Sequence, residues 1–152
     1  MSVRFTLQAV MDLAREHVDA ASVRLGQAMQ RLMAADRQLQ TLLQYREEYQ
    51  GKLRDSVTSG IDPAHWRNFH LFLAKLDAGI DRARAQADGA RESAKKSQAE
   101  WQELQRKLKA YGVLAERHQR EQQLASAKRE QRETDDRAAT HYSRKATTQR
   151  PR

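Results

Sequence analysis

Residues 59–63, which read Ser-Gly-Ile-Asp-Pro, decide the fold of this chain, because they interrupt a sequence that is otherwise almost free of helix breakers. Gly60 supplies a helix stop, since glycine adopts the left-handed conformation at little cost. Asp62 and Pro63 are typical of an N-cap and of the first residue of a new helix. The stretch predicts a turn at about residues 58–62 between two helices.

A seven-residue repeat fills the chain on both sides of this turn. Before the turn, the positions spaced alternately by three and four residues are apolar except for Arg46; they are Leu7, Met11, Ala14, Val18, Ala21, Leu25, Ala28, Leu32, Ala35, Leu39, Leu42, Arg46, Tyr49 and Leu53. After the turn they are Phe69, Leu73, Leu76, Ile80, Ala83, Ala87, Ala90, Ala94, Ser97, Trp101, Leu104, Leu108, Tyr111 and Ala115. A 3.5-residue period keeps one seam facing a partner helix, so both stretches predict a coiled coil.

The short turn makes the two helices antiparallel and places residue i opposite roughly residue 121 minus i. We therefore expect an all-α fold, a long two-helix antiparallel coiled-coil hairpin over residues 1–136, with helix 1 at about 5–57 and helix 2 at about 63–136. Helix 2 loses its partner after about residue 116. The apolar period ends there too, since the same positions continue as His118, Gln122, Ala125, Arg129 and Arg132. Residues 118–136 are thus expected to form an unpaired C-terminal helical overhang.

The positive charge is concentrated at the C-terminus. Of the net charge of +8, the last sixteen residues carry five Lys or Arg and no Asp or Glu. Because they also lack an apolar period and contain Thr-Thr and Pro151, we expect residues 137–152 to be a basic disordered tail. The rest of the chain has interspersed signs, as solvated coiled-coil flanks do.

The sequence predicts no enzyme. Without cysteine there are no disulfides or thiolate metal sites, and there is no Gly-rich phosphate loop. No two of the five histidines are three or four residues apart, so a metal site is not expected. We expect no catalytic residue, no cofactor and no metal. The first residues lack an apolar leader and no apolar stretch reaches membrane-spanning length, which favours a cytoplasmic protein without direct membrane insertion.

Several aromatic residues lie off the seam or at its edge near the turn. Tyr45 and Phe72 occupy g positions. The register places Tyr45 near Leu76 and Tyr49 near Phe72, so these residues gather on the third of the hairpin nearest the turn, where Phe69 also lies. An aromatic group rimmed by polar residues has the composition of a protein-binding hot spot. The alternative interpretation is that Tyr45 and Phe72 fold over the seam and widen the core.

With its heptad repeat, its turn and its aromatic residues near the turn, the chain resembles the flagellar FliJ family, the small coiled-coil component of the flagellar type III export apparatus. The resemblance covers about residues 5–136 without gaps, and includes residues 5–14 (FTLQAVMDLA), 42–49 (LLQYREEY), Gly60-Ile61, 66–76 (WRNFHLFLAKL), Ile80, Trp101 and 130–136 (EQRETDD). The resemblance implies an antiparallel hairpin similar to the central stalk of rotary ATPases, located in the cytoplasm and peripherally at the inner face of the cell membrane at the flagellar base.

The resemblance also implies three kinds of partner. The N-terminus and the C-terminal part of helix 2 would bind the pore of the hexameric export ATPase FliI and promote its assembly and activity; by position these residues are Phe5, Leu7, His118, Gln122, Arg129 and Arg132. The hairpin side would contact the cytoplasmic domain of the export-gate protein FlhA through Gln38, Leu42, Tyr45, Tyr49, Phe72 and Leu76. Positions 79 and 83 would continue this surface, but Gly79 and Ala83 offer little side chain. Export chaperones would be escorted.

Two other functions stay open. One is the equivalent stalk of a virulence-type type III secretion injectisome, which shares fold and mechanism. The other is a basic coiled-coil arm that binds nucleic acid. Such an arm needs a cationic stripe along one face, and the near-balance of charge outside the tail argues against it, so we expect no nucleic-acid partner.

Overall fold

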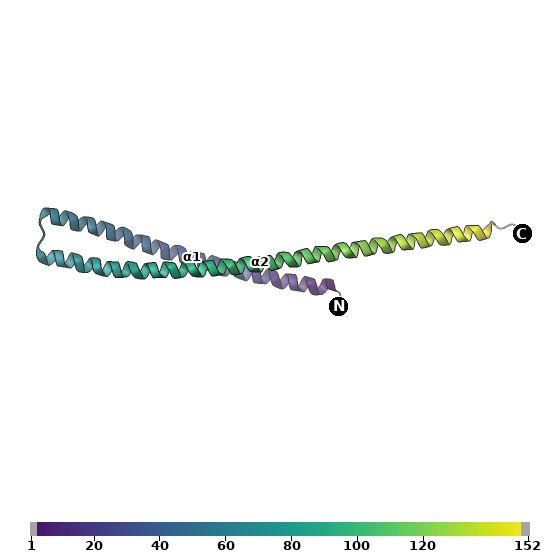
Figure 1. The fold of residues 1–152 in the computed structure, drawn as a ribbon, viewed down its shortest axis with the longest axis horizontal. Coiled ribbons are helices and arrows are strands. Elements are labelled where there is room, and N and C mark those ends of the chain that lie inside the picture. The colour runs from purple at the N-terminus through teal and green to yellow at the C-terminus, as the bar shows by residue number, and fades with distance from the viewer. Residues whose placement is uncertain (1–2, 150–152) are drawn as a thin grey trace. The chain divides into compact units, whose positions relative to one another are not determined.

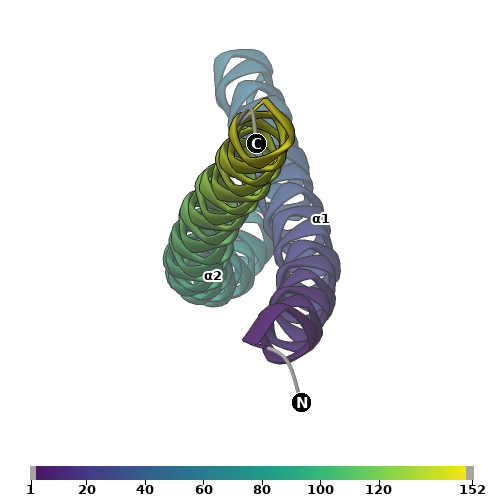
Figure 2. The ribbon, with the colours of Figure 1, turned by 90° about the vertical axis from the view of Figure 1, so that its right-hand side faces the viewer.

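The computed structural model describes residues 3–149, except for the side chains of Arg4 and Phe5. The described residues form two helices, α1 (Val3–Ser59) and α2 (Pro63–Thr148), and include no strand (Figure 1). Seen end-on, the described chain consists of α1 and α2 with no third layer against them (Figure 2). The all-α fold predicted from the heptads is confirmed.

Three residues, 60–62, connect the helices. Gly60 has a φ of 90°, the left-handed conformation that favours glycine, and its N–H donates to the Val57 carbonyl at 3.3 Å. The Asp62 carbonyl accepts the Trp66 N–H at 3.0 Å, which is the first hydrogen bond of the new helix. Pro63 then occupies the first helical position, where no N–H is needed. The turn therefore has the composition and the geometry that the sequence predicts.

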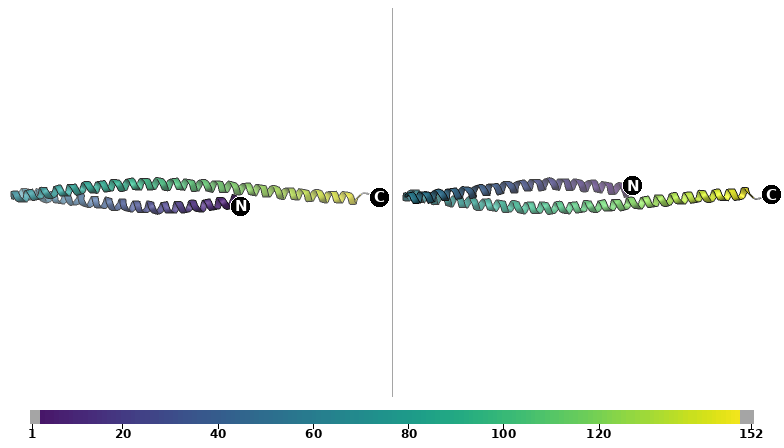
Figure 3. Two further views of the ribbon diagram at one scale, coloured as in Figure 1. Left: turned by 90° about the horizontal axis from the view of Figure 1, so that it is seen from below. Right: turned by 90° about the horizontal axis from the view of Figure 1, so that it is seen from above.

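The chain divides into two compact units, and each is described by itself. The hairpin unit is Glu16–Gln105, and the terminal unit is Met1–Arg15 with Arg106–Arg152. In the hairpin unit, α1 and α2 lie side by side and are antiparallel: α1 runs toward the turn and α2 runs away from it (Figures 1 and 3). Every predicted seam position from Val18 to Leu53 and from Phe69 to Leu104 is buried or half-buried.

Alanine is the commonest of the buried residues in the seam of the hairpin unit. The buried residues are Val18, Ala21, Ala28, Leu73, Leu76, Ile80, Ala83, Ala87 and Ala94. Leu25, Leu32, Leu39 and Leu42 stay half-buried, because two helices cannot enclose a long side chain on all sides. The alanines let the helix backbones approach closely, so the hairpin gains its stability from many thin layers rather than from a three-dimensional core.

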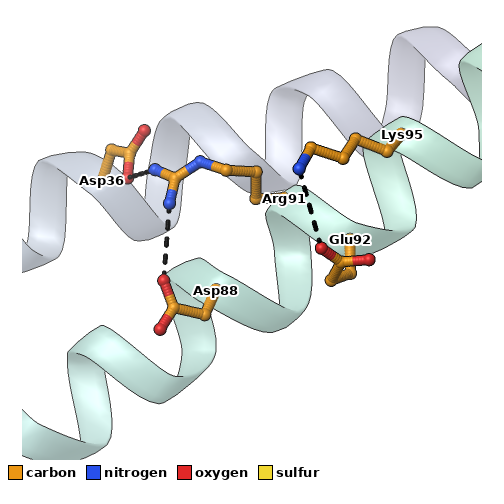
Figure 4. A network of polar contacts seen from close by, with 5 residues as sticks. All are labelled: Asp36, Asp88, Arg91, Glu92 and Lys95. Atoms are coloured by element: carbon orange, nitrogen blue, oxygen red, sulfur yellow. Dashed lines mark hydrogen bonds and ion pairs between the residues drawn. The ribbon is translucent and has the colours of Figure 1, made fainter.

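Ion pairs link the two helices beside this seam. Arg24 contacts Glu100 at 2.6 Å, and Arg91 of α2 contacts Asp36 of α1 at 3.4 Å. Figure 4 shows the pair of Arg91 with Asp36. It also shows two pairs within α2, Arg91 with Asp88 and Lys95 with Glu92. The side chains of the two pairs between the helices are about half exposed, so each pair contributes little to stability. They do fix the register, which lies within a few residues of the predicted one.

In the terminal unit, Leu7, Met11 and Ala14 of α1 share a seam with Leu108, Tyr111, Ala115 and His118 of α2, all of them buried or half-buried. Every described residue after His118 is exposed. The apolar packing thus ends where the sequence predicts, and the overhang is helical.

The predicted end of helix 2 near residue 136 is wrong. α2 continues to Thr148, so residues 137–148 of the expected disordered tail are helical, and residues 150–152 lie outside the described part. Once a helix exists, each further residue is cheap to add, whereas starting a helix is costly. Ala138, Ala139 and Ala146 favour continuation, and no proline occurs between Pro63, at the start of α2, and Pro151. The hydroxyls of Thr140 and Thr147 donate to carbonyls four residues earlier.

Over the described residues, neither helix contains an apolar stretch that could span a membrane. In the same part of the chain, no group of three or more His, Cys, Asp or Glu could hold a metal ion.

Candidate functional site and partner-binding surfaces

The structure brings four rings together near the turn of the hairpin unit, and we call them the aromatic patch: Tyr45, Tyr49, Phe69 and Phe72. Tyr49 is at their centre, with ring centroids 4.5 Å from Phe72, 5.0 Å from Phe69 and 6.5 Å from Tyr45. Tyr45 meets Phe72 edge-on at 6.1 Å. These are the distances at which aromatic rings attract one another, so the patch has a fixed shape.

The off-seam aromatics pack over the seam and also keep exposed surface. Phe72 and Tyr45 pack on the seam residue Tyr49 and so widen the core, yet 48% of Tyr45 and 36% of Phe72 remain exposed. A rigid, half-exposed aromatic surface can lose the rest of its hydration against a partner at little cost in entropy. The patch is therefore both a packing element and a candidate contact surface.

The other residues expected on the gate-facing surface differ in exposure. Gln38 is exposed and Leu42 is half-buried, so both can reach a partner at the edge of the patch. Leu76 is buried and supports the patch from beneath. Ala83 is only 3% exposed and Gly79 has no side chain, so the surface does not continue past Leu76 as the family pattern implies.

A charged pair lies beside the patch. Arg46, the one polar seam residue of the first stretch, donates from its Nε to Oδ1 of Asp77 at 2.5 Å and from a terminal nitrogen to Oδ2 at 3.4 Å. The hydrogen bond from Arg46 lowers the pKa of Asp77, and the charge of the guanidinium acts in the same direction. The same hydrogen bond raises the pKa of Arg46. The fork geometry fixes how α1 and α2 are aligned under the tyrosines.

A second surface lies in the terminal unit, where a half-open cavity of about 140 Å³ forms between α1 and α2. We call it the basal cavity, and its lining residues are Leu7, Gln8, Met11, Ala115, His118, Gln119 and Gln122. His118 lines this cavity, and its Nε2 atom is buried without a hydrogen-bond partner among the described residues. A buried polar atom that is left unpaired costs free energy.

Of the residues expected to contact the export ATPase, the structure brings together Leu7, His118 and Gln122, all at the basal cavity. Arg129 and Arg132 are exposed on the overhang and do not line this cavity. The side chain of Phe5 lies outside the described residues. The described residues among those expected to contact the export ATPase thus lie at a cavity and on a separate stretch of exposed helix.

Sequence reasoning missed Gln8 and Gln119 at the cavity and Asp77 at the patch. The glutamines lie next to seam positions at the end of the apolar period, a signal that exists but is weak. Asp77 directly follows the seam residue Leu76, and a seam arginine such as Arg46 needs an acidic partner. The predicted register places Arg46 opposite about residue 75, and Asp77 is the nearest acidic residue to that position, so the signal for this pair was present in the sequence.

Comparison with known proteins gives one family and two curated relatives. The family model described as Flagellar FliJ protein matches residues 3–147. Two curated relatives, both described as Flagellar FliJ protein, come from Salmonella typhi and from Escherichia coli strain K12. Each is 28% identical to this chain over 145 residues, which covers 95% of this chain and 99% of the relative.

Proposed function

The chain belongs to the flagellar FliJ protein family and is thereby a component of the flagellar export apparatus, and on that premise we propose that it is a non-enzymatic stalk that links the export ATPase to the export gate. The ATPase partner is the hexameric FliI, and the gate partner is the cytoplasmic domain of FlhA. The protein works in the cytoplasm, peripherally at the inner face of the cell membrane, and escorts export chaperones. Matches to flagellar relatives favour this role over that of an injectisome stalk.

The observation that carries the proposal is the overhang. From residue 119 to 148 α2 is helical, and every one of these residues is exposed. Gln119 and Gln122, at the start of this stretch, line the basal cavity together with residues of α1. This stretch is roughly 45 Å long at 1.5 Å per residue. A lone helix this polar is marginal in water, so a binding partner that surrounds it would stabilise it. A ring with a central pore is such a partner, and the basal cavity with its unpaired His118 Nε2 lies where the overhang begins.

The aromatic patch supplies the second contact. It is on the hairpin unit, whereas the overhang and the basal cavity are on the terminal unit, so the two partners bind different parts of the chain. Gln38 and Leu42 extend the patch on α1, and Leu76 holds it from below. Its rigid tyrosine and phenylalanine rings suit an apolar pocket on the gate domain.

Coupling between the partners follows from symmetry. A single helix inside a six-fold ring cannot contact all six subunits in the same way. It therefore binds some subunit conformations better than others, and this difference in affinity biases nucleotide occupancy and ring assembly. A chain that binds the export ATPase and the export gate at the same time transmits this bias from one partner to the other.

The proposal is tested by measuring the affinity of purified FliI for the chain and for the double variant Arg129→Glu/Arg132→Glu. We expect the variant to bind at least about tenfold more weakly, because two charge reversals on a contacting face oppose docking. The matched control is Arg82→Glu/Arg84→Glu, which reverses two exposed arginines of the hairpin unit and should bind like the unchanged chain. Equal loss in both variants, or in neither, would contradict the assignment of the overhang.

A further inference from the structure

The gate-facing surface ends abruptly on one side. Past Leu76, the seam turns inward to the buried residues Ile80 and Ala83, and Gly79 carries no side chain. A partner that docks on the aromatic patch therefore gains no exposed side-chain contact area from the seam beyond Leu76. Additional contact area must come from the residues between the patch and the turn.

In that direction α2 presents a row of aromatic side chains at intervals of three residues: Phe72, Phe69 and Trp66. Residues spaced by three are neighbours on a helix surface and form a ridge. Phe72 and Phe69 both contact Tyr49 of α1, at 4.5 Å and 5.0 Å. The ridge is thus continuous with the aromatic patch, and Trp66 is its end.

Trp66 is fixed in place and yet half exposed. Its ring centroid is 4.1 Å from that of His70, one turn later on the same helix, and 47% of the residue remains accessible. Among the described residues, none accepts a hydrogen bond from the indole N–H. Tryptophan is the residue most enriched at binding hot spots, because it offers a large rigid apolar area and one directional donor.

Phe69, the middle residue of the ridge, has surroundings that suit a protein partner. It lines an open groove at the turn, together with Asp55, Ser56, Ile61, Asp62 and His65, whereas Trp66 lies outside this groove. This gives an aromatic centre bordered by small and charged polar groups, which is the usual composition of a protein interface with a polar rim.

We propose that Trp66 is a further contact residue for the gate partner, and that the gate-binding surface of this chain extends from the aromatic patch toward the turn. The inference rests on the proposed function, since it takes the occupant to be the domain that binds the patch. That domain would present an apolar pocket for the indole and an acceptor, a carbonyl or carboxylate oxygen, for its N–H.

The test measures the affinity of the purified FlhA cytoplasmic domain for the full chain and for Trp66→Ala, Trp66→Phe and Leu71→Ala. We expect binding to fall by about tenfold or more in Trp66→Ala and less in Trp66→Phe, which keeps a ring but loses the donor. Leu71→Ala is the matched control, because Leu71 is 64% exposed and lies five residues away on another face of the same helix. Circular dichroism should be unchanged in all three variants.

Fluorescence gives a second measurement. In a Trp101→Phe variant, Trp66 is the only tryptophan of the chain, and its emission should shift to shorter wavelengths when the gate domain is added. If Trp66→Ala binds like the unchanged chain while Tyr45→Ala does not, the inference is wrong and the proposed function stands. If the unchanged chain does not bind, both are wrong. An emission shift that follows the concentration of the chain alone would assign the surface to a second copy and overturn the inference.

Discussion

At the scale of single residues, the pair Arg46–Asp77 explains how a charged side chain fits into an apolar seam. An arginine at this position would be an uncompensated cation among tyrosines and leucines if nothing faced it. The two hydrogen bonds to Asp77 satisfy it and tie α1 to α2 at one register. Since heptads of small residues permit register slips, this pair specifies alignment more than it adds stability.

The pair predicts a dependence of stability on pH. The folded pKa of Asp77 lies below its unfolded value, so its contribution is present above about pH 4 and is lost as the pH falls through the folded pKa. Asp77→Asn should lower the melting temperature at pH 7, and the difference from the unchanged chain should shrink toward pH 2. Asp81→Asn, at an exposed aspartate of the same helix, is the control. A difference that stays constant with pH would contradict the role of the pair.

The aromatic patch predicts a separation of binding from folding. Tyr45→Ala and Phe72→Ala should each weaken binding of the FlhA cytoplasmic domain by about tenfold, because each removes a half-exposed ring of a contact surface. Helicity measured by circular dichroism and stimulation of the export ATPase should be retained. If either variant loses helical signal, the residue belongs to the core and the surface assignment fails.

The seven-residue period and the composition of the sequence determine which features of this fold could be predicted. Every seam position from Leu7 to His118 that the heptads predict is buried or half-buried, and the aromatics meet as the register requires. The partner of Arg46 was missed although the signal was present. The register places Arg46 opposite about residue 75, and Asp77 is the nearest acidic residue to that position on α2.

At the scale of elements, the turn depends on one backbone conformation. Gly60 has a φ of 90°, and a side chain added there would have open space but a strained backbone. Gly60→Ala should therefore destabilise the hairpin by about 1 kcal/mol, the cost of a left-handed non-glycine residue. The free energy of unfolding in urea measures this. Gly26→Ala, in the middle of α1 with open space around it, should instead be neutral or stabilising.

At the C-terminal end of α2, the amino-acid composition predicts the wrong structure. The last sixteen residues resemble a disordered tail in charge and in their threonines, yet helix continues to Thr148. The overhang before them already supplies a helical end, so no new nucleus is needed. Compositional rules apply to segments that stand alone, and this segment does not.

At the scale of the whole molecule, the described residues present two distinct candidate surfaces. The aromatic patch belongs to the hairpin unit, and the basal cavity and overhang belong to the terminal unit. Such an arrangement suits a connector, whose function is measured in its partners. The central claim is that the terminal unit acts on the export ATPase.

The most direct test is ATP hydrolysis by purified FliI, titrated with the full chain and with a truncation that ends at Arg117. The account predicts that the full chain raises the rate and that the truncation, with its overhang and His118 removed, does not. Circular dichroism of both forms confirms that each is folded. Absence of stimulation by the folded full chain, or equal stimulation by both forms, would contradict the account.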